Sequence, residues 1–571
     1  MSSDGTQGPV EPPMRLELRD MIKDHPDQWT LYLLALERFQ AVPEDQPLSY
    51  FQIAGIHGRP AMKWPDQKWN RAEGLDLGRG YGGYCTHSSI LFLTWHRPYL
   101  ALFEARCEYI KAARTFRMPY WDWARPELPL FPDEALSRRE HVVERPESQK
   151  GDTDKFPGKI NPLASYKFGE DAAIDQFTAP KLGVKGMNVS ERILFLLQGY
   201  KGFGAVSNNS EFGNGTTEIP FNDWGSIEDV HNAVHGYIGG GYMGRPPLSA
   251  FDPIFWLHHT NIDRLFAIWQ ACNPGKYVIP KDSTEPTVVR AAGSEETVDS
   301  PLTPFAQSVA ADGQQKFWTS AGVVDTKTFG YIYPETQSVF NSRKRILNEV
   351  DRLYLKRASF ANILRSQPGD VETLKQLQQR AKTHLKSEGT AAPELPAGRD
   401  IQKLAVGGKY LEWLVNIRAE KAELNGNYIV NIFLGDPDSN TLPLLYVKDH
   451  AHVGSFATFG QDENSSCDNC KKGREEKLKI TGQIPLTIAL VERYLAGQVD
   501  SLKPEHITLP TEELKSPEDT KNLLICVVSN EVTFKADNSE VPEYSDVVTS
   551  YPEITNDIPE SFGTGYDGNN F

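Results

Sequence analysis

The sequence predicts a mainly α-helical domain with long loops, followed by a smaller antiparallel β-sandwich domain. A chain of 571 residues is longer than one hydrophobic core usually organises, so a large domain and at least one smaller one are expected. Apolar residues recur with a helical period in the first part and alternate with polar ones beyond residue 400. With 39% apolar and 11% aromatic residues, the chain can fill such interiors.

The first domain carries helix-period apolar positions in residues 14–40, 90–113, 226–272 and 345–364. Within the first of these stretches, Pro26 and Asp27 mark a break and a new start. Residues 120–221 are rich in Pro, Gly, Asn and charge, which predicts long loops. Loops of that length in a compact domain often cover a functional site.

A segment of small residues, Pro and Gly at 386–400 has no periodicity and indicates a linker. Strand-like alternation follows in residues 410–420, 426–435, 442–456, 477–490 and 522–534. We therefore divide the chain into a helical domain at 1–385, a linker at 386–400 and a β domain at 401–571.

Net charge, hydropathy and cysteine content argue against nucleic-acid binding, a membrane span and a disulfide framework. The formal net charge is −16, and no dense Lys/Arg cluster is interleaved with aromatic residues, so nucleic acid is not an expected partner. The sequence has no run of 18 apolar residues and no secretory signal, so we expect no membrane span and a cytoplasmic protein. Six cysteines are too few for a disulfide framework in a chain of this size, which favours reduced thiols.

Two histidines stand four residues apart in "SIEDVHNAVHGYI", which places His231 and His235 one turn apart on one face of a helix. Two imidazoles so placed can hold one metal ion. The spacing is common, however, and by itself it more often marks a solvated helix face.

The next predicted helix adds a third imidazole. It begins at "DPIFWLHH", with an Asp cap and a Pro in its first turn. His259 is the one polar member of an apolar stripe and therefore faces the interior; the other members are Phe255, Ile262, Phe266 and Trp269. His258 lies on an adjacent, more polar stripe, which makes it a candidate neighbour of the metal ligands.

A second group of histidines lies earlier in the chain. His96 faces the interior of the helix predicted over 90–113. His87 lies nine residues away, and about 900° of helical rotation would put it on the opposite side. Both can bind one ion only if His87 lies in the glycine-rich loop before the helix. His57, between two glycines, is likewise expected in a loop.

Two groups of three histidines, without carboxylates at ligand spacing, indicate a metal that prefers imidazole. Copper fits best, and zinc and iron are chemically compatible. A zinc protease would carry Glu beside the first histidine of HExxH, and here that residue is Asn232. A di-iron bundle needs Glu-x-x-His twice, and Glu228-x-x-His231 supplies it once near a predicted core helix.

Two longer motifs, "HSSILFLTWHRPYLALFE" and "DPIFWLHHTNID", resemble the copper signatures of type 3 copper proteins of the tyrosinase and catechol oxidase group. Three more, "SYFQIAGIHGRP", "MPYWDW" and "FGYIYPE", resemble fungal tyrosinases. The resemblance implies a four-helix bundle around a dicopper site, with O2 as co-substrate. It assigns one copper ion to His57, His87 and His96, and the other to His231, His235 and His259.

The resemblance also implies roles for residues around the ligands. Cys85 would be joined to the His87 ring by a thioether bond; the alternative is a small buried thiol that packs. Glu228 and Asn232 match a pair that holds a water for deprotonating a phenol; the alternative is two polar residues of a helix face. Pro246 matches a gate residue over the first copper.

Three further residues are expected around the second copper ligands. Asp263 and Arg264, one turn beyond His259, are placed to orient ligand imidazoles through hydrogen bonds. His258 is expected in the same outer layer.

The C-terminal domain resembles the shielding domain of latent tyrosinases, in which an aromatic side chain blocks the copper site until the domain is cut off. Phe459 is the first candidate for that side chain and Phe456 the second. An activating protease is therefore an expected partner, with 386–400 as the cleavage region. Cys467 and Cys470 resemble a CxxC element that passes copper to the site, although a lone CxxC is equally compatible with a redox or incidental pair.

The implied activity is the oxidation of phenols by O2. It comprises the ortho-hydroxylation of monophenols and the oxidation of o-diphenols to o-quinones that feed melanin formation, with tyrosine, DOPA or catechols as expected substrates. Two alternatives stay open: a catechol oxidase that acts on diphenols only, and a haemocyanin-like protein that binds O2 without turnover. A homo-oligomer is compatible with the sequence.

Overall fold

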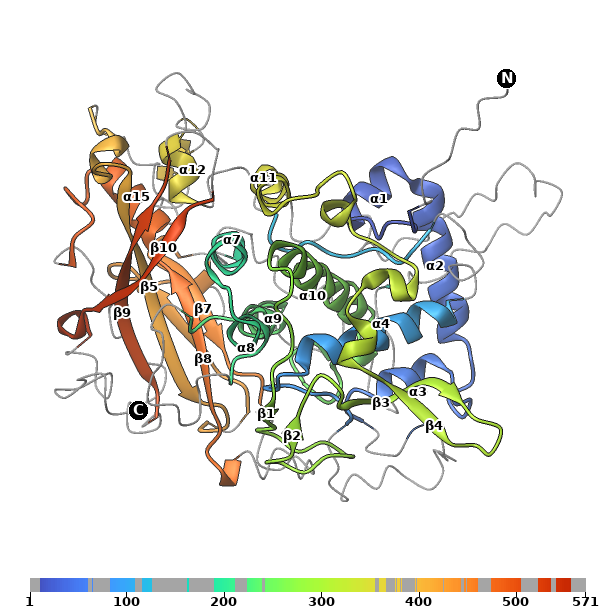
Figure 1. The fold of residues 1–571 in the computed structure, drawn as a ribbon. Helices are drawn as coiled ribbons and strands as arrows, with labels where there is room; N and C mark the ends of the chain where they lie inside the picture. The colour runs from blue at the N-terminus through green and yellow to red at the C-terminus, as the bar shows by residue number, and fades with distance from the viewer. Residues whose placement is uncertain are drawn as a thin grey trace, which may run out of the picture.

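Figure 1 shows the fold of the chain in a computed structural model. The structure describes residues 11–59, 64, 83–107, 116–125, 162–163, 189–210, 223–238, 242–354, 359–365, 375, 377–379, 381–382, 396, 398–424, 426–442, 446–447, 449–460, 474–504, 522–535 and 541–555.

The central domain is built on helices that pack around one long helix, α10 (Figure 1). Its helices are α1 (Leu18–Asp24), α2 (Pro26–Gln40), α3 (Tyr50–Gly55), α4 (Phe92–Arg106), α7 (Val189–Gly199), α8 (Phe203–Ser207), α9 (Ile227–Ile238), α10 (Pro253–Cys272) and α11 (Arg343–Leu353). Helix α10 packs against α4, α7, α9 and α11, and α7 packs against α9, so these helices form the helical core that carries most of the histidines of both groups.

Local sequence signals set the helix starts. The side chain of Asp252 accepts a hydrogen bond from the backbone N–H of Ile254 and so caps α10, while Pro253 is its first residue. Pro26 starts α2 in the same way, directly after the break that the sequence predicts. The helix predicted over 90–113 begins at Phe92, and residues 108–113 lie outside the described residues.

The central domain also contains two small antiparallel hairpins that the sequence analysis did not predict. Their strands are β1 (Lys281–Asp282) with β2 (Glu295–Glu296), and β3 (Pro301–Val309) with β4 (Gln315–Thr319). Short 3₁₀ helices lie at Ser249–Phe251, Ser320–Val323, Thr326–Phe329 and Pro334–Thr336.

The C-terminal domain consists of two antiparallel sheets, as predicted. One has the strand order β10-β9-β5-β8 and the other pairs β6 with β7. The strands are β5 (Lys409–Glu420), β6 (Ile429–Phe433), β7 (His452–Ala457), β8 (Lys479–Pro485), β9 (Leu524–Thr533) and β10 (Glu543–Ser550). The sheets touch face to face, because a Cβ on Gly454 of β7 would lie 2.6 Å from the Ile484 side chain of β8.

The strand predicted over 477–490 is wrong in its second half. Strand β8 ends at Pro485, and α15 (Thr487–Leu495) follows it. The reason is the change of period: beyond Pro485 the apolar residues Ile488, Val491 and Leu495 recur three and four residues apart, and they are buried in one cluster. Two further 3₁₀ helices lie at Ile401–Leu404 and Pro552–Ile554.

The two domains share an apolar contact. Strand β5 is buried on both faces, since Leu414 belongs to the core of the central domain and Val415 to the core of the C-terminal domain. Helices α7 and α9 pack against β7 and β8 across this contact. The helix that carries two of the predicted metal ligands therefore lies directly under the C-terminal domain.

Helix α12 (Phe360–Arg365) lies before the predicted linker but packs with the C-terminal domain (Figure 1). Its residues Phe360 and Ile363 share a buried cluster with Tyr410 and Ile488, whereas Tyr354 belongs to the central core. Judged by these packing contacts, the domain boundary lies between residues 354 and 360, earlier than the predicted boundary at 385. The reason is that the apolar face of α12 packs against residues beyond 400.

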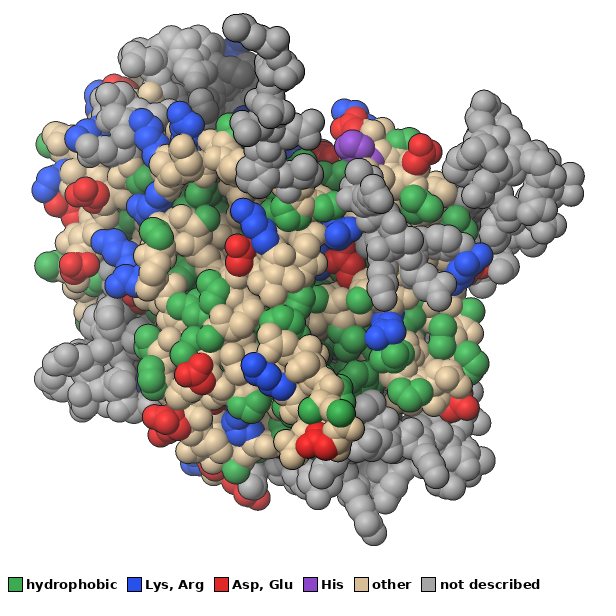
Figure 2. Space-filling model, turned by 45° about the vertical axis from the view of Figure 1, so that its right-hand side comes forward, with side chains coloured by type: hydrophobic (Ala, Val, Ile, Leu, Met, Phe, Trp, Pro, Cys, Tyr) green, Lys and Arg blue, Asp and Glu red, His purple; other side chains and the backbone are tan. Residues whose placement is uncertain are grey.

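The surface mixes charges of both signs. On the face shown in Figure 2, acidic and basic side chains of the described residues are interspersed with small apolar patches. Within the described part of the chain, no helix is both long and apolar enough to cross a bilayer.

Candidate metal centre

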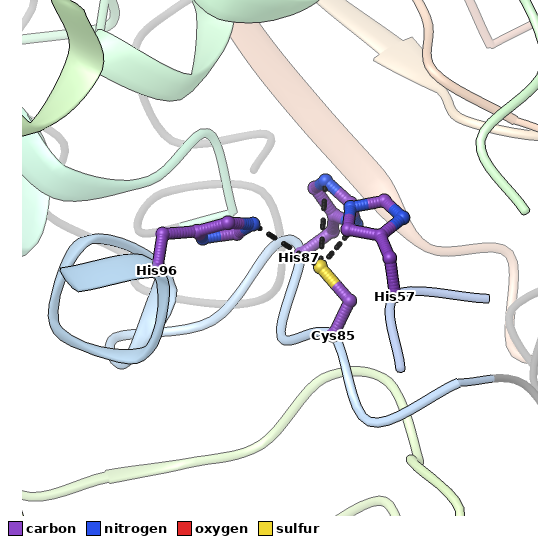
Figure 3. Close-up of side chains that lie close together, drawn as sticks. All are labelled: His57, Cys85, His87 and His96. Carbon is purple, nitrogen blue, oxygen red and sulfur yellow. Dashed lines mark hydrogen bonds between the residues drawn. The ribbon is translucent and has the colours of Figure 1, made fainter. Parts of the chain in front are cut away.

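Side chains from three separate segments meet in the first group of candidate ligands (Figure 3). One atom each of His57, Cys85, His87 and His96 lies within 4.8 Å of the others. His57 follows α3, Cys85 and His87 come from the loop before α4, and His96 lies in the second turn of α4. The structure thus places His87 outside the helix, where helical phase required it to be.

A close crossing of two loops brings these segments together. The backbone N–H of Tyr84 donates to the carbonyl of Ile56, at 3.0 Å. A Cβ on Gly83 would lie 2.0 Å from the carbonyl oxygen of His57, so only glycine allows the approach. Beyond His87, Ser88 takes a left-handed conformation with φ of 50° and turns the chain into α4.

The second group joins two neighbouring helices of the bundle. His231 and His235 lie on α9 and His259 on α10, and all three are buried. The Nε2 atom of His231 lies 3.0 Å from that of His235 and 3.1 Å from that of His259. The structure therefore brings together the three histidines that the sequence grouped.

Carbonyl oxygens fix the orientation of the rings. Nδ1 of His57 donates to Pro246 at 3.1 Å, that of His96 to Phe92 at 2.7 Å, and that of His235 to Met243 at 2.7 Å. Because a carbonyl only accepts, Nδ1 carries the proton in each ring and Nε2 keeps its lone pair. This is the hydrogen-bonding pattern typical of metal-ligating histidines.

Burial keeps these imidazoles neutral. Desolvation lowers the pKa of His96 to about 4 and that of His235 to about 3. Neutral rings whose Nε2 lone pairs face one another at about 3 Å repel unless a cation lies between them. In the first group, Nε2 of His57 is buried without a hydrogen-bond partner among the described residues. The residues present fit a metal ion that prefers imidazole.

The two groups form one continuous site. The ring of His96 stacks on that of His259 with centroids 4.4 Å apart, and the rings of His87 and His231 are 5.6 Å apart. Two ions held by these groups would be close neighbours, as a binuclear centre requires.

Cys85 lies between two of the rings (Figure 3). Its Sγ is 3.4 Å from Nδ1 of His87 and 3.4 Å from Nε2 of His96. Cys85 is a free thiol in the structure, and burial raises its pKa well above the ordinary value. The contact brings the sulfur beside the His87 ring; the thioether bond itself stays a prediction.

His258 also lies near the second group, and a hydrogen bond separates its role from that of His259. Trp123 donates its indole N–H to Nδ1 of His258, at 2.9 Å. Since Nδ1 accepts, the proton of the neutral ring sits on Nε2, which then has no lone pair for a metal. The structure thus favours His259 as the ligand and His258 as its neighbour, in line with the stripe argument.

Glu228 reaches the back of the first group from α9. Its carboxylate accepts from the backbone N–H of Ser88 at 2.7 Å and from that of Asn209 at 3.3 Å. Burial raises the pKa of Glu228 to about 8. Asn232, one turn further on, accepts from Nδ1 of His231 at 2.9 Å and so holds that ring.

Lys421 is a neighbour of the site that the sequence analysis missed. Its ammonium group lies 2.8 Å from the carboxylate of Glu285 and 3.2 Å from the hydroxyl of Ser88, which follows His87 directly. Lys421 directly follows β5 in the C-terminal domain and lies 333 residues along the chain from its serine partner. Nothing in its local sequence signals this contact.

Asp263 and Arg264 do not contact the ligand rings, which corrects the expectation that they orient them directly. Asp263 accepts from Arg97, at 2.6 Å, and from two tyrosines, and Arg264 pairs with Glu335 and Asp122. These ion pairs and hydrogen bonds brace α10 against α4 and the segments that carry Asp122 and Glu335. Pro246 contributes its carbonyl to His57, as described above; the gate role stays a prediction.

The two candidate blocking residues lie in different surroundings. The ring of Phe459 is 4.4 Å from that of His235, 5.3 Å from that of His87 and 5.6 Å from that of His231, and only 4% of the residue is exposed. Phe456 instead belongs to the apolar core of the C-terminal domain. Cys467 and Cys470 lie outside the described residues.

Comparison with known proteins agrees with this geometry. The family described as the common central domain of tyrosinase matches residues 47–272, and the tyrosinase C-terminal domain matches residues 412–509. The tyrosinase of Neurospora crassa is 33% identical over 96% of this chain and 96% of its own length. The chain belongs to the tyrosinase family. It is thus an oxidoreductase of the type that acts on phenols, and the metal that the family implies is copper.

A second curated relative supports the family assignment, and two solved structures show the same fold. The tyrosinase of Podospora anserina is 36% identical over 84% of this chain and 93% of its own. Recombinant mushroom tyrosinase has a TM-score of 0.67 at 23% identity, with 95% of this chain and 98% of that chain covered. Aspergillus oryzae holo-protyrosinase has a TM-score of 0.62 at 21% identity, with 94% and 96% covered. The two solved structures share the fold over both domains.

Proposed function

We propose that this chain is a latent tyrosinase that holds two copper ions, hydroxylates monophenols and oxidises o-diphenols to o-quinones with O2. One observation carries the proposal: two groups of three neutral imidazoles converge and stack on each other, and all of these rings are buried except that of His87, which is partly buried. Copper bound there would supply the redox chemistry that lets O2 oxidise a phenol. The ligands would be His57, His87 and His96 for one ion, and His231, His235 and His259 for the other.

Glu228 would assist the deprotonation of the phenol. A free phenol has a pKa near 10, so its deprotonation near neutral pH needs a positioned acceptor. Two backbone N–H groups hold the carboxylate in place, and its raised pKa of about 8 suits an acceptor that works near neutral pH. We assign Glu228, with Asn232 on the same face of α9, to hold the water that takes this proton.

Latency would come from the C-terminal domain. The Phe459 ring lies against three of the proposed ligands, where a phenolic ring would otherwise approach the metal ions. Turnover of phenols would therefore require that this side chain leave the site. The expected partners are a small phenol and an activating protease.

The test compares the intact chain with single variants after copper loading. Phe459→Ala should raise O2 consumption with a diphenol at least tenfold without any cut, whereas Phe456→Ala, the same change inside the C-terminal core, should not. Quinone formation from a monophenol identifies a tyrosinase, and reaction with diphenols alone identifies a catechol oxidase. A chain that binds about two copper ions and O2 but turns over no phenol after Phe459→Ala is a carrier and overturns the proposal.

A further inference from the structure

The placement of α12 bears on how the C-terminal domain is released. This helix precedes residues 386–400 in the sequence, so a cut in that region leaves it joined to the central domain. In the structure it packs beside α15 in the C-terminal domain (Figure 1). Cleavage at 386–400 would therefore divide the chain after α12, whereas the packing contacts divide it before α12.

Apolar contacts of α12 with the C-terminal domain are extensive. Phe360 and Ile363 are each 1% exposed, and Leu364 is 5% exposed. The Phe360 ring meets the Tyr410 ring edge-on, with centroids 5.0 Å apart. The cluster also includes Ala361, Leu377, Ile401, Ile488, Val491, Tyr494, Leu495, Val499 and Val532. Apart from the members at 360–377, all of these lie beyond residue 400.

Hydrogen bonds join the same parts of the chain. The side-chain amide of Gln402 donates to the carbonyl of Leu364, at 2.9 Å. The guanidinium of Arg365 donates to the carbonyl of Lys535, also at 2.9 Å. Both bonds bind α12 to segments that lie on the far side of the predicted cleavage region.

The chain just before α12 is held by the central domain. Tyr354, at the end of α11, is buried in the central core and its hydroxyl donates to Asp122, at 3.3 Å. Tyr354 is thus anchored in the central domain, whereas Phe360 is anchored in the C-terminal domain. A cut at 386–400 does not separate these two anchors, because both stay on the same fragment.

We propose that α12 is an internal strap: after cleavage within 386–400 it retains the C-terminal domain on the central domain. The apolar face of α12 packs against β5, β9 and α15, while the helix stays covalently joined to the central domain. The C-terminal domain can leave only if α12 separates from these elements. That separation exposes the buried face of α12 to water, so it slows dissociation of the C-terminal fragment. Retention of the C-terminal domain by α12 does not depend on the proposed function. The effect of this retention on phenol oxidation does rest on it.

The first experiment uses two full-length chains with the same inserted protease recognition sequence, one within 386–395 and one directly before Ser359. Each is cut to completion without copper, and dissociation of the fragments is followed by size-exclusion chromatography after dilution. We expect the C-terminal fragment to leave at least tenfold more slowly when the cut lies after α12. Equal dissociation rates overturn the proposal.

The second experiment weakens the strap itself. In the chain cut within 386–395, Ile363→Ala should speed dissociation at least fivefold, whereas Ile525→Ala should not. Ile525 is a matched control, because it is buried in the C-terminal core cluster that does not contain α12. Thermal unfolding of the uncut variants shows that both still fold. Equal rates for the two variants contradict the proposal, whatever the outcome of the phenol assays.

Discussion

At the scale of single residues, the position of one proton separates two adjacent histidines. His258 and His259 are both buried and both lie near the second group. The Trp123 N–H places the ring proton of His258 on Nε2, the atom that a metal would need. A hydrogen bond from outside the site thus decides which of the two histidines can serve as a ligand.

This leads to a prediction for metal content. His259→Ala removes one of three imidazoles from the second ion, so the copper content should fall from about two ions per chain toward one. His258→Ala leaves all six proposed ligands in place and should keep about two ions. Metal analysis after equilibrium loading and dialysis measures both. If His258→Ala loses as much copper as His259→Ala, the assignment of the ligand is wrong.

At the scale of elements, the site depends on how closely two loops cross. The segment before α4 passes the turn after α3 with no space for a side chain at Gly83. Gly58 is equally confined, since a Cβ there would lie 2.3 Å from the backbone of Pro247. The turn that carries His57 is therefore clamped between two other segments, one of which supplies the carbonyl of Pro246 to its ring.

Gly83→Ala should displace the His57 turn, because the clash is with backbone and no flexible side chain can yield. We expect a loss of at least about 1 kcal/mol in the free energy of unfolding, together with loss of about one copper ion. Gly202→Ala is the control, since a Cβ there has nothing within 4 Å. Urea unfolding and metal analysis measure the two effects. An unchanged copper content in Gly83→Ala would show that the crossing is not needed for the site.

At the scale of the whole molecule, the two domains bury acidic groups against each other. Glu412 of β5 accepts hydrogen bonds from Thr487 at 2.7 Å and from Tyr410 at 3.1 Å. It lines one cavity with Glu191 of α7 and Tyr544 of β10. Burial, with the charge of Glu191, raises the pKa of Glu412 from 4.5 to about 7.

The sign of the resulting pH dependence follows from that shift. A carboxyl group whose pKa is raised in the folded chain stabilises the fold fully below pH 4.5 and loses this contribution as pH rises through about 7. The loss amounts to roughly 3 kcal/mol, since each pKa unit corresponds to about 1.4 kcal/mol. Glu412→Gln should flatten the fall in stability between pH 5 and pH 8.

Urea unfolding at several pH values measures this slope. Glu531→Gln is the control, because Glu531 is half exposed on β9 and paired with Lys409. Glu228, with a pKa of about 8, titrates in the same pH range. The measured quantity is therefore the difference in slope between Glu412→Gln and the parent chain. Equal slopes in Glu412→Gln and the parent chain would contradict the assignment.

The sequence alone determined those features that depend on near neighbours in the chain. The four-residue spacing of His231 and His235, the apolar stripe around His259 and the rotation between His87 and His96 are consequences of helical geometry. The alternation beyond residue 400 likewise predicts strands, although it did not reveal the change of period at Pro485. Motif resemblance added the pairing of the two groups, which spacing could not give.

Only the tertiary structure decided which distant residues meet. It placed Lys421 beside Ser88, chose Phe459 over Phe456 for contact with the imidazoles, and paired Asp263 with Arg97. It also assigned α12 to the C-terminal domain, against the boundary that composition suggested. The physical reason is that helical and strand periods are set by neighbouring backbone units. Burial and ion pairing instead depend on surfaces that exist only once segments far apart in the sequence have packed together.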